Sequence, residues 1–172
     1  MKKILLLLTI CLAYVYVDAQ TIDKKLLYGK WMLYSMGGDG HTILKDSMEQ
    51  NITLKINHTR IQDPGRQMTM NDSLKLASNI RKRYTDLFKS YMKFDEKGNC
   101  GMQLGTEKVE NGQVIEQKGT YVWSSENTII QTFGKSNPET FVIVILTSNK
   151  LVIKEGLQSE DEKQLVMSFI KE

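Results

Sequence analysis

The arrangement of apolar and polar residues along the chain divides it into three kinds of segment. Residues 4–12 form an almost unbroken apolar run. Most of the remaining chain alternates apolar and polar residues in short stretches that end at glycine, asparagine or aspartate, which is typical of half-buried β-strands joined by turns. Residues 71–92 differ, because their apolar side chains recur every three or four positions, and this spacing predicts an amphipathic helix.

The alternating stretches predict about eight to ten short strands. The first is expected at residues 30–36, and the glycine-rich turn at residues 37–40 ends it. Another is expected at residues 51–56, whose two isoleucines and one leucine would share one face of a strand. Residues 93–104 are predicted to be extended on both sides of a turn at Asp95–Gly98. Further strands are predicted over residues 107–117, 120–123, 128–133, 140–146, 151–154 and 165–169.

The close spacing of these strands favours a mainly β fold, a single antiparallel up-and-down barrel, over any arrangement that alternates strands and helices. Asn111-Gly112 is a strong signal for a tight hairpin. Residues 140–146 are continuously apolar, which predicts a central strand buried on both sides. The helix near residues 71–92 is inserted into this pattern, and Asn71 or Asp72 could cap its start. We expect it to pack against the barrel or to cover one end.

Several segments together resemble the bacterial lipocalin-like domain family. Residues 27–31, Leu-Tyr-Gly-Lys-Trp, are similar to the lipocalin start, where Gly-x-Trp opens the first strand. The later segments MKFDEKGNC, KGTYVW, FVIVILTSNKLVIKE and LVMSFIK follow in an order similar to that family's, so the resemblance covers nearly all of residues 26–171. The resemblance implies a barrel with a cup-like interior, wide enough for one small ligand.

The same resemblance assigns a structural motif to Gly29, Trp31 and Lys171. It implies that Trp31, which follows Gly29 by two positions, packs across the closed end of the barrel. A basic residue on the last strand would stack on the indole in a cation–π contact. Lys171 is the candidate, where the wider superfamily prefers arginine.

Large apolar side chains on the predicted strands are candidates for the lining of a ligand cup. An ordinary filled core explains such side chains at least as well, because the mixture of apolar and polar groups in a ligand site cannot be read from one sequence. The candidate lining residues are Met102, Tyr121, Trp123, Phe133, Phe141 and Met167.

The beginning of the chain has the organisation of a secretory signal peptide. Lys2 and Lys3 precede the apolar run, and Val17-Asp18-Ala19 offers a cleavage site of small residues before Gln20. Residues 1–19 are therefore expected to be a signal peptide and residues 20–172 the barrel domain, exported to the periplasm or the cell exterior. Cys11 follows Ile10 rather than a small residue, so simple cleavage is favoured over a lipid anchor at Cys11.

Composition gives little support to catalysis. The formal net charge of the 172-residue chain is only +3, so bulk charge predicts no particular partner. Cys100 is the one cysteine after the expected cleavage, and we interpret it as a small buried hydrophobic residue. His41 and His58 lie in no metal-ligand or nucleophile motif. A Ser-His-Asp triad is a spatial arrangement, and no Gly-x-Ser-x-Gly motif in the sequence supports one. We therefore expect no enzyme, no metal and no cofactor.

Two surface features have plain explanations beside functional ones. Arg81-Lys82-Arg83 could meet an anionic surface, but a solvated helix face is favoured, and export argues against nucleic acid as a partner. Asp46-Ser47-Met48 and Asp72-Ser73-Leu74 resemble acceptor triplets of a bacterial periplasmic O-glycosylation system at Ser47 and Ser73. Such triplets are short and common, so a turn and a helix cap are the favoured explanation.

The leading hypothesis is an exported, non-catalytic protein that binds a small hydrophobic or amphiphilic ligand inside the barrel. The alternative is a protein-interaction module of the cell envelope, with a filled barrel and no ligand cavity. The expected partners are thus a small apolar ligand or an envelope protein. After cleavage no apolar run in the sequence is long enough to cross a membrane as a helix.

Overall fold

The fold was described from a computed structural model of the chain. The structure describes residues 22–38, 41–62, 68–103, 105, 109–110, 113–155 and 164–172. The expected signal peptide at residues 1–19 lies outside the described residues, as does the Asn111-Gly112 turn. Among the described residues, no helix combines the length and the apolar character needed to cross a membrane.

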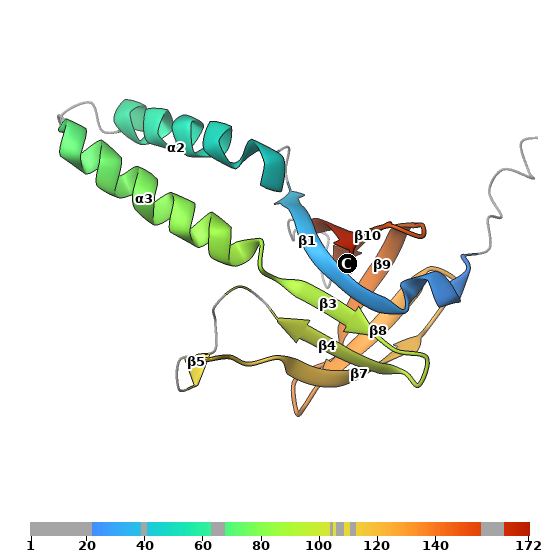
Figure 1. The fold of residues 1–172 in the computed structure, drawn as a ribbon. Helices are drawn as coiled ribbons and strands as arrows, with labels where there is room; N and C mark the ends of the chain where they lie inside the picture. Colours follow the sequence, from blue (N-terminus) through green and yellow to red (C-terminus); the bar gives the residue numbers. More distant parts are fainter. Residues whose placement is uncertain are drawn as a thin grey trace, which may run out of the picture.

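Strands dominate the described part of the chain (Figure 1). The sequence of elements is η1 (Lys24–Leu27), β1 (Gly29–Gly38), β2 (His41–Leu44), η2 (Lys45–Ser47), α2 (Met48–Gln62), α3 (Met70–Leu87), β3 (Tyr91–Phe94), β4 (Asn99–Gln103), β5 (Val109–Glu110), β6 (Gln113–Val114), β7 (Gln117–Trp123), β8 (Thr128–Phe133), β9 (Glu139–Leu146), β10 (Lys150–Glu155) and β11 (Val166–Lys171).

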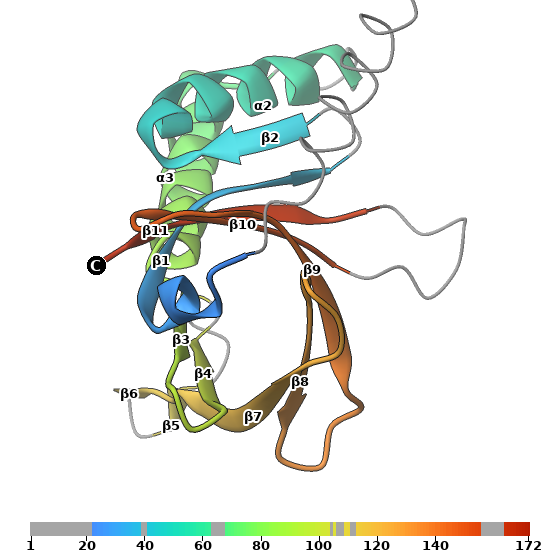
Figure 2. The same cartoon turned by 90° about the vertical axis from the view of Figure 1, so that its right-hand side faces the viewer.

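Eight of these strands close into an antiparallel barrel. The strand order is β11-β10-β9-β8-β7-β4-β3-β1, and pairing between β1 and β11 joins the two ends, so the strands surround a common interior (Figure 2). Trp31 lies opposite Lys171 in the closing pair, and a register shift then places Ser35 opposite Ser168, whose hydroxyl groups form a hydrogen bond. β2 extends the sheet beyond β1, and β5 and β6 form a separate two-stranded sheet. The predicted mainly β, up-and-down barrel is confirmed.

The barrel strands bury one face each, as the period-two pattern predicts. In β8, for example, Ile129, Gln131 and Phe133 are buried, whereas the residues between them are partly exposed. In β10, Leu151 and Ile153 are fully buried. The buried faces of all eight strands meet in one apolar core.

The strand predicted at residues 51–56 is wrong, because these residues belong to helix α2. Ile52 and Ile56 are four positions apart, so in a helix they lie on one side, and Ile52 is 2% exposed. Leu54, which a strand would place beside them, is 65% exposed. Helix α2 pairs with α3, and this packing overrides the strand preference of its β-branched residues.

Helix α3 confirms the predicted inserted helix, but its first and last residues differ from the predicted ones. Thr69, rather than Asn71 or Asp72, is the N-cap: its hydroxyl accepts a hydrogen bond from the Asp72 N–H, and the Asp72 carboxylate accepts one from the Thr69 N–H. The helix ends at Leu87, and the residues predicted as its last turn include Tyr91 and Met92 of strand β3. The helix pair projects from the barrel (Figure 1), so α3 packs mainly against α2, which sequence reasoning did not expect.

The prediction that residues 140–146 are buried on both sides is also wrong. In β9 Phe141 and Ile143 are buried, but Val144 and Ile145 are 47% and 40% exposed. A barrel strand has one face toward solvent, so a continuous apolar run here covers part of the outer wall.

Candidate functional site

The interior of the barrel contains most of the residues predicted to line a cup. Met102, Tyr121, Phe133, Phe141 and Met167 are all buried members of the core. Trp123 is only partly buried, and the Lys24 ammonium group lies 4.8 Å from the centroid of its ring. The structure therefore brings five of the six side chains into one core and leaves Trp123 beside η1, near one end of the barrel.

That end is closed by η1 and by the motif that the lipocalin resemblance assigned. Trp31 is fully buried and donates a hydrogen bond from Nε1 to the Leu27 carbonyl, at 2.7 Å. The Lys171 Nζ atom lies 5.0 Å from the centroid of the Trp31 ring and donates a hydrogen bond to the Leu26 carbonyl. Gly29 has a φ of +123°, and a Cβ atom there would lie 2.9 Å from the Lys171 side chain. A glycine at this position thus lets the lysine reach the indole.

Gln131 is a polar side chain within the apolar interior of the barrel. It is fully buried on β8, between Ile129 and Phe133 along the inner face of the strand. Within the described part of the chain, neither its Oε1 nor its Nε2 atom has a hydrogen-bond partner. An unpartnered buried amide costs roughly 1–3 kcal/mol, so such a group calls for an explanation.

The cross-strand neighbours of Gln131 define its surroundings. On one side it pairs with Tyr121, whose hydroxyl is already used, because it donates to the Asp95 carbonyl at 2.8 Å. Burial raises the pKa of Tyr121 to about 12, so this hydroxyl keeps its proton. On the other side Gln131 pairs with Glu139, the first residue of β9.

Two carboxylates lie at the end of the barrel opposite η1. Glu139 precedes the buried Phe141 by two positions, so both side chains project from the same face of β9. Glu155 is the cross-strand partner of Phe141 and follows the buried Ile153 by two positions. Burial raises the pKa of Glu139 above its usual value, and the negative charge of Glu155 raises it further. We call Glu139, Glu155 and Gln131 the acidic rim.

A concave feature lies against β3, β4 and β7. It is a pocket of about 230 Å³, and none of the six predicted lining residues borders it. Lys93 and Lys118 are exposed on either side of Gly101, and the Glu116 side chain lies over that glycine and accepts a hydrogen bond from the Tyr91 hydroxyl at 3.0 Å. The lining residues are Lys93, Asp95, Asn99, Cys100, Gly101, Glu116, Lys118 and Gly119.

Cys100 is buried, and its chemistry is that of a protected thiol. Burial, together with the negative charge of Asp95, raises its pKa to about 11. The thiolate is the nucleophilic form of cysteine, so a raised pKa lowers reactivity at neutral pH. In the part of the chain that the structure describes, no three potential metal-ligating His, Cys, Asp or Glu side chains come together.

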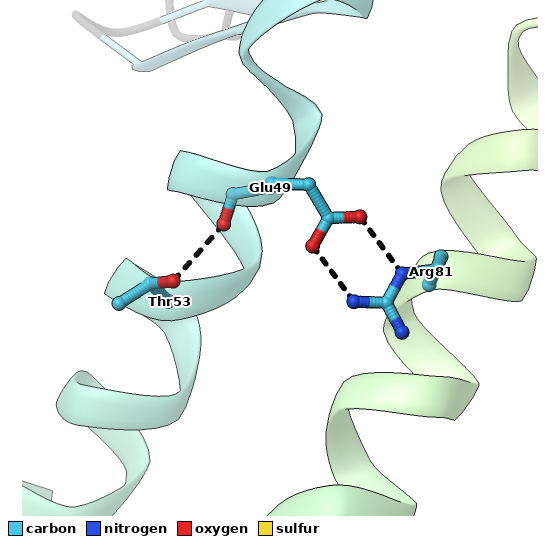
Figure 3. A network of polar contacts seen from close by, with 3 residues as sticks. All are labelled: Glu49, Thr53 and Arg81. Atoms are coloured by element: carbon cyan, nitrogen blue, oxygen red, sulfur yellow. Dashed lines mark hydrogen bonds and ion pairs between the residues drawn. The ribbon is translucent and has the colours of Figure 1, made fainter.

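One residue of the basic segment Arg81-Lys82-Arg83 forms an ion pair within the protein. Arg81 donates two hydrogen bonds to the Glu49 carboxylate, at 2.8 and 2.7 Å, and so links α3 to α2 (Figure 3). Lys82 and Arg83 are exposed. Of the two glycosylation candidates, Ser47 ends η2 and Ser73 lies in the first turn of α3.

Sequence reasoning missed the acidic rim. One signal was present, because Gln131 takes an inward position between two apolar residues of a strand that was correctly predicted. Glu139 and Glu155 gave no such signal, since they stand at the ends of strands where charged residues are ordinary. Their proximity depends on the pairing of β9 with β8 and β10.

Comparisons with known proteins concern the fold. No family model and no curated protein matches the chain. Among solved structures, the chain is similar to a DUF4847 family protein from Bacteroides vulgatus ATCC 8482, with 13% identity and a TM-score of 0.47, over 84% of this chain and 93% of that chain. It is also similar to a redesigned β-barrel, with 11% identity and a TM-score of 0.41, over 86% of this chain and 93% of that chain.

Proposed function

We propose that this protein is an exported, non-catalytic, lipocalin-like carrier that binds a small hydrophobic or amphiphilic molecule within the barrel. The observation that carries the proposal is Gln131, a fully buried amide without a partner among the described residues. The resemblance of residues 26–171 to the lipocalin-like family supports the same function.

The unpartnered amide favours a ligand with a polar group. A buried amide that gains a hydrogen-bond partner recovers part of the free energy lost when water was removed from it. Apolar side chains such as Phe133 and Phe141 lie near Gln131 on the inner face. Burial of apolar ligand surface against them would contribute roughly 25 cal/mol per Å² before the costs of association. An apolar body with one polar group therefore fits the site best.

The test uses three probes with the same tail: octanol, octanoic acid and octylamine. Each is titrated into the processed protein, and the Gln131 side-chain amide resonances are followed by NMR. We expect at least one probe to bind with one-to-one stoichiometry and to shift these resonances. The Gln131→Met variant removes the amide and is expected to bind that probe more weakly, whereas the control variant Gln103→Met, at the end of β4, is expected to bind it as the wild type does.

Native mass spectrometry of protein purified from its own host supplies an independent readout. A copurifying small molecule that is lost in Gln131→Met would support the proposal. If no molecule copurifies and none of the three probes perturbs the Gln131 amide, the barrel is not a carrier of this kind.

Export is part of the proposal. The charged start, the apolar run and the Val17-Asp18-Ala19 site support cleavage after Ala19, which would remove Cys11 and with it the site of a lipid anchor. Intact mass measurement of the protein recovered from the periplasm or the medium is expected to show a chain that begins at Gln20. A mature protein that retains Cys11 with an attached lipid would contradict simple cleavage.

A second candidate function is a protein-interaction module, and the helix pair favours it. Leu54, Met70 and Leu74 are 65%, 80% and 59% exposed on α2 and α3, although large apolar side chains are normally placed inside. Crosslinking in envelope membranes would test this alternative. The interaction module predicts an envelope protein that is captured by the wild type and by Gln131→Met, but not by a Leu54→Glu, Leu74→Glu variant.

A further inference from the structure

The acidic rim places two carboxylates next to the unpartnered amide. Glu139 is the direct cross-strand partner of Gln131, and both project from the inner face of the barrel. Glu155 lies on the next strand, opposite Phe141. Because residues two positions apart on a strand share a face, the two glutamates and the amide converge at the same end of the interior.

Lys135 lies in the turn between β8 and β9 at this end, but no ion pair joins it to either glutamate in the described part of the chain. Neither Glu139 nor Glu155 forms an ion pair with a described lysine, arginine or histidine. Other acids do form ion pairs, such as Glu49 with Arg81 and Glu172 with Lys30. Two like charges placed together cost free energy that an added positive charge would offset, although both glutamates are exposed.

We propose that the ligand of the barrel is an amphiphilic amine, whose ammonium group donates hydrogen bonds to Glu139 and Glu155 and to the Gln131 side-chain carbonyl. This inference rests on the proposed function, since it names the class of molecule that the barrel would carry. An ammonium group is a hydrogen-bond donor, and the two carboxylates are acceptors, so the contacts are charge-assisted. The apolar tail would extend from Gln131 into the interior, toward Ile129 and Phe141.

The donor set at the rim fits an amine better than a metal ion. Hard divalent cations such as Ca²⁺ take six to eight oxygen ligands. No group of three or more acidic, histidine or cysteine side chains surrounds this point within the described residues. An amine needs only a few acceptors and brings its own apolar chain, which matches an interior that is otherwise lined by hydrocarbon and aromatic groups.

Calorimetric titration with the three octyl probes separates this inference from the proposed function. We expect octylamine to bind roughly tenfold more tightly than octanol, since charge-assisted hydrogen bonds are about twice as strong as neutral ones. Octanoic acid is expected to bind most weakly, because the carboxylates repel it. In a Glu139→Gln, Glu155→Gln variant the preference for octylamine over octanol is expected to disappear.

The matched control is Glu126→Gln, an exposed acid in the turn between β7 and β8, at the opposite end of the barrel. This variant changes net charge without touching the rim, so its octylamine affinity is expected to equal that of the wild type. A charge reversal, Glu155→Lys, is expected to shift the preference from octylamine toward octanoic acid. Because Glu155 is exposed, this variant is expected to fold, and its circular dichroism spectrum checks that.

The outcomes are distinguishable. If octanol or octanoic acid binds as tightly as octylamine, or if Glu126→Gln lowers octylamine affinity as much as the rim variant does, the amine inference is overturned and the carrier function stands. If no probe binds to wild type or variants, the carrier function fails, and the amine inference fails with it.

Discussion

The ammonium group of Lys171 lies over the ring of Trp31, 5.0 Å from its centroid, and the two residues are direct cross-strand partners in the pairing that closes the barrel. The same ammonium group donates a hydrogen bond to the Leu26 carbonyl at 3.1 Å. The last strand is thereby attached both to the first strand and to the short helix η1 that covers this end. Gly29 makes the arrangement possible, since a Cβ atom at this position would meet the lysine side chain.

We expect Lys171→Met to lower the free energy of unfolding by roughly 1–2 kcal/mol, because it removes a cation–π contact and a charged hydrogen bond. Lys171→Arg is expected to lose less, since a guanidinium group can still lie over the indole. Urea unfolding followed by tryptophan fluorescence, which comes from Trp31 and Trp123, measures both. Lys150→Met, which removes an exposed lysine from the start of β10, is the control. Equal stabilities of Lys171→Met and Lys150→Met would show that the contact contributes nothing.

Gln131→Met is expected to stabilise the protein without ligand by roughly 1–3 kcal/mol. The amide is buried and unpartnered among the described residues, and methionine of similar length removes the cost of burying it. Chemical denaturation of the ligand-free protein tests this expectation, with Gln103→Met as the control for methionine substitution at a half-buried position. A large loss of stability in Gln131→Met would mean that the amide has a partner in solution.

Glu139→Gln is expected to be more stable than the wild type at neutral pH. The native pKa of Glu139 lies above its usual value of 4.5, so the native state binds more protons than the unfolded state between the two values. The free energy of unfolding therefore falls as pH rises through this window, and the loss persists above it. Below both pKa values the acid is neutral in both states and the variant has no advantage.

Urea unfolding at neutral and at acid pH measures this difference. Glu126→Gln controls for the change in net charge, since its side chain is exposed and distant from the rim. If Glu139→Gln gains as much stability at acid pH as at neutral pH, the gain does not come from the ionised carboxylate.

Cys100 is expected to resist alkylation in the folded processed protein. Because burial raises its pKa to about 11, only a very small fraction is thiolate near pH 7.5, and the thiolate is the reactive form. Intact mass measurement during iodoacetamide treatment is expected to show slow labelling in buffer and fast labelling in denaturant. Labelling at the same rate in both conditions would show that the thiol is open to solvent.

Arg81→Met is expected to affect the helix pair and to leave the barrel unchanged. The two hydrogen bonds to Glu49 join α3 to α2 (Figure 3). The helix pair projects from the barrel (Figure 1). Because both side chains are exposed, this ion pair contributes little to global stability. Hydrogen exchange is expected to accelerate in Met48–Gln62 and Met70–Leu87 only. Lys82→Met controls for loss of a positive charge on the same helix. Equal acceleration in the barrel strands would contradict this separation.

The mainly β, up-and-down barrel and its inserted helix were predictable because the signals involved are local. A period of two in the strand sequences and a period near 3.6 in the segment that became α3 follow from the geometry of each element. The interior positions of Phe133, Phe141 and Met167 follow from the same alternation. The prediction for residues 51–56 was wrong because isoleucine and leucine at every second position also fit a strand. The packing of α3 against this segment favours the helix, in which Ile52 and Ile56 lie on one side.

Tertiary structure alone decided the composition of the candidate site. The pairing of β1 with β11 brings Trp31 and Lys171 together, although the sequence separates them by almost the whole domain. The pairing of β9 with both β8 and β10 brings Glu139 beside Gln131 and Glu155 near them. A single sequence records which way each side chain points along its strand, but the register between strands is fixed by long-range packing. That register determines which charges share a rim and which polar group is left without a partner.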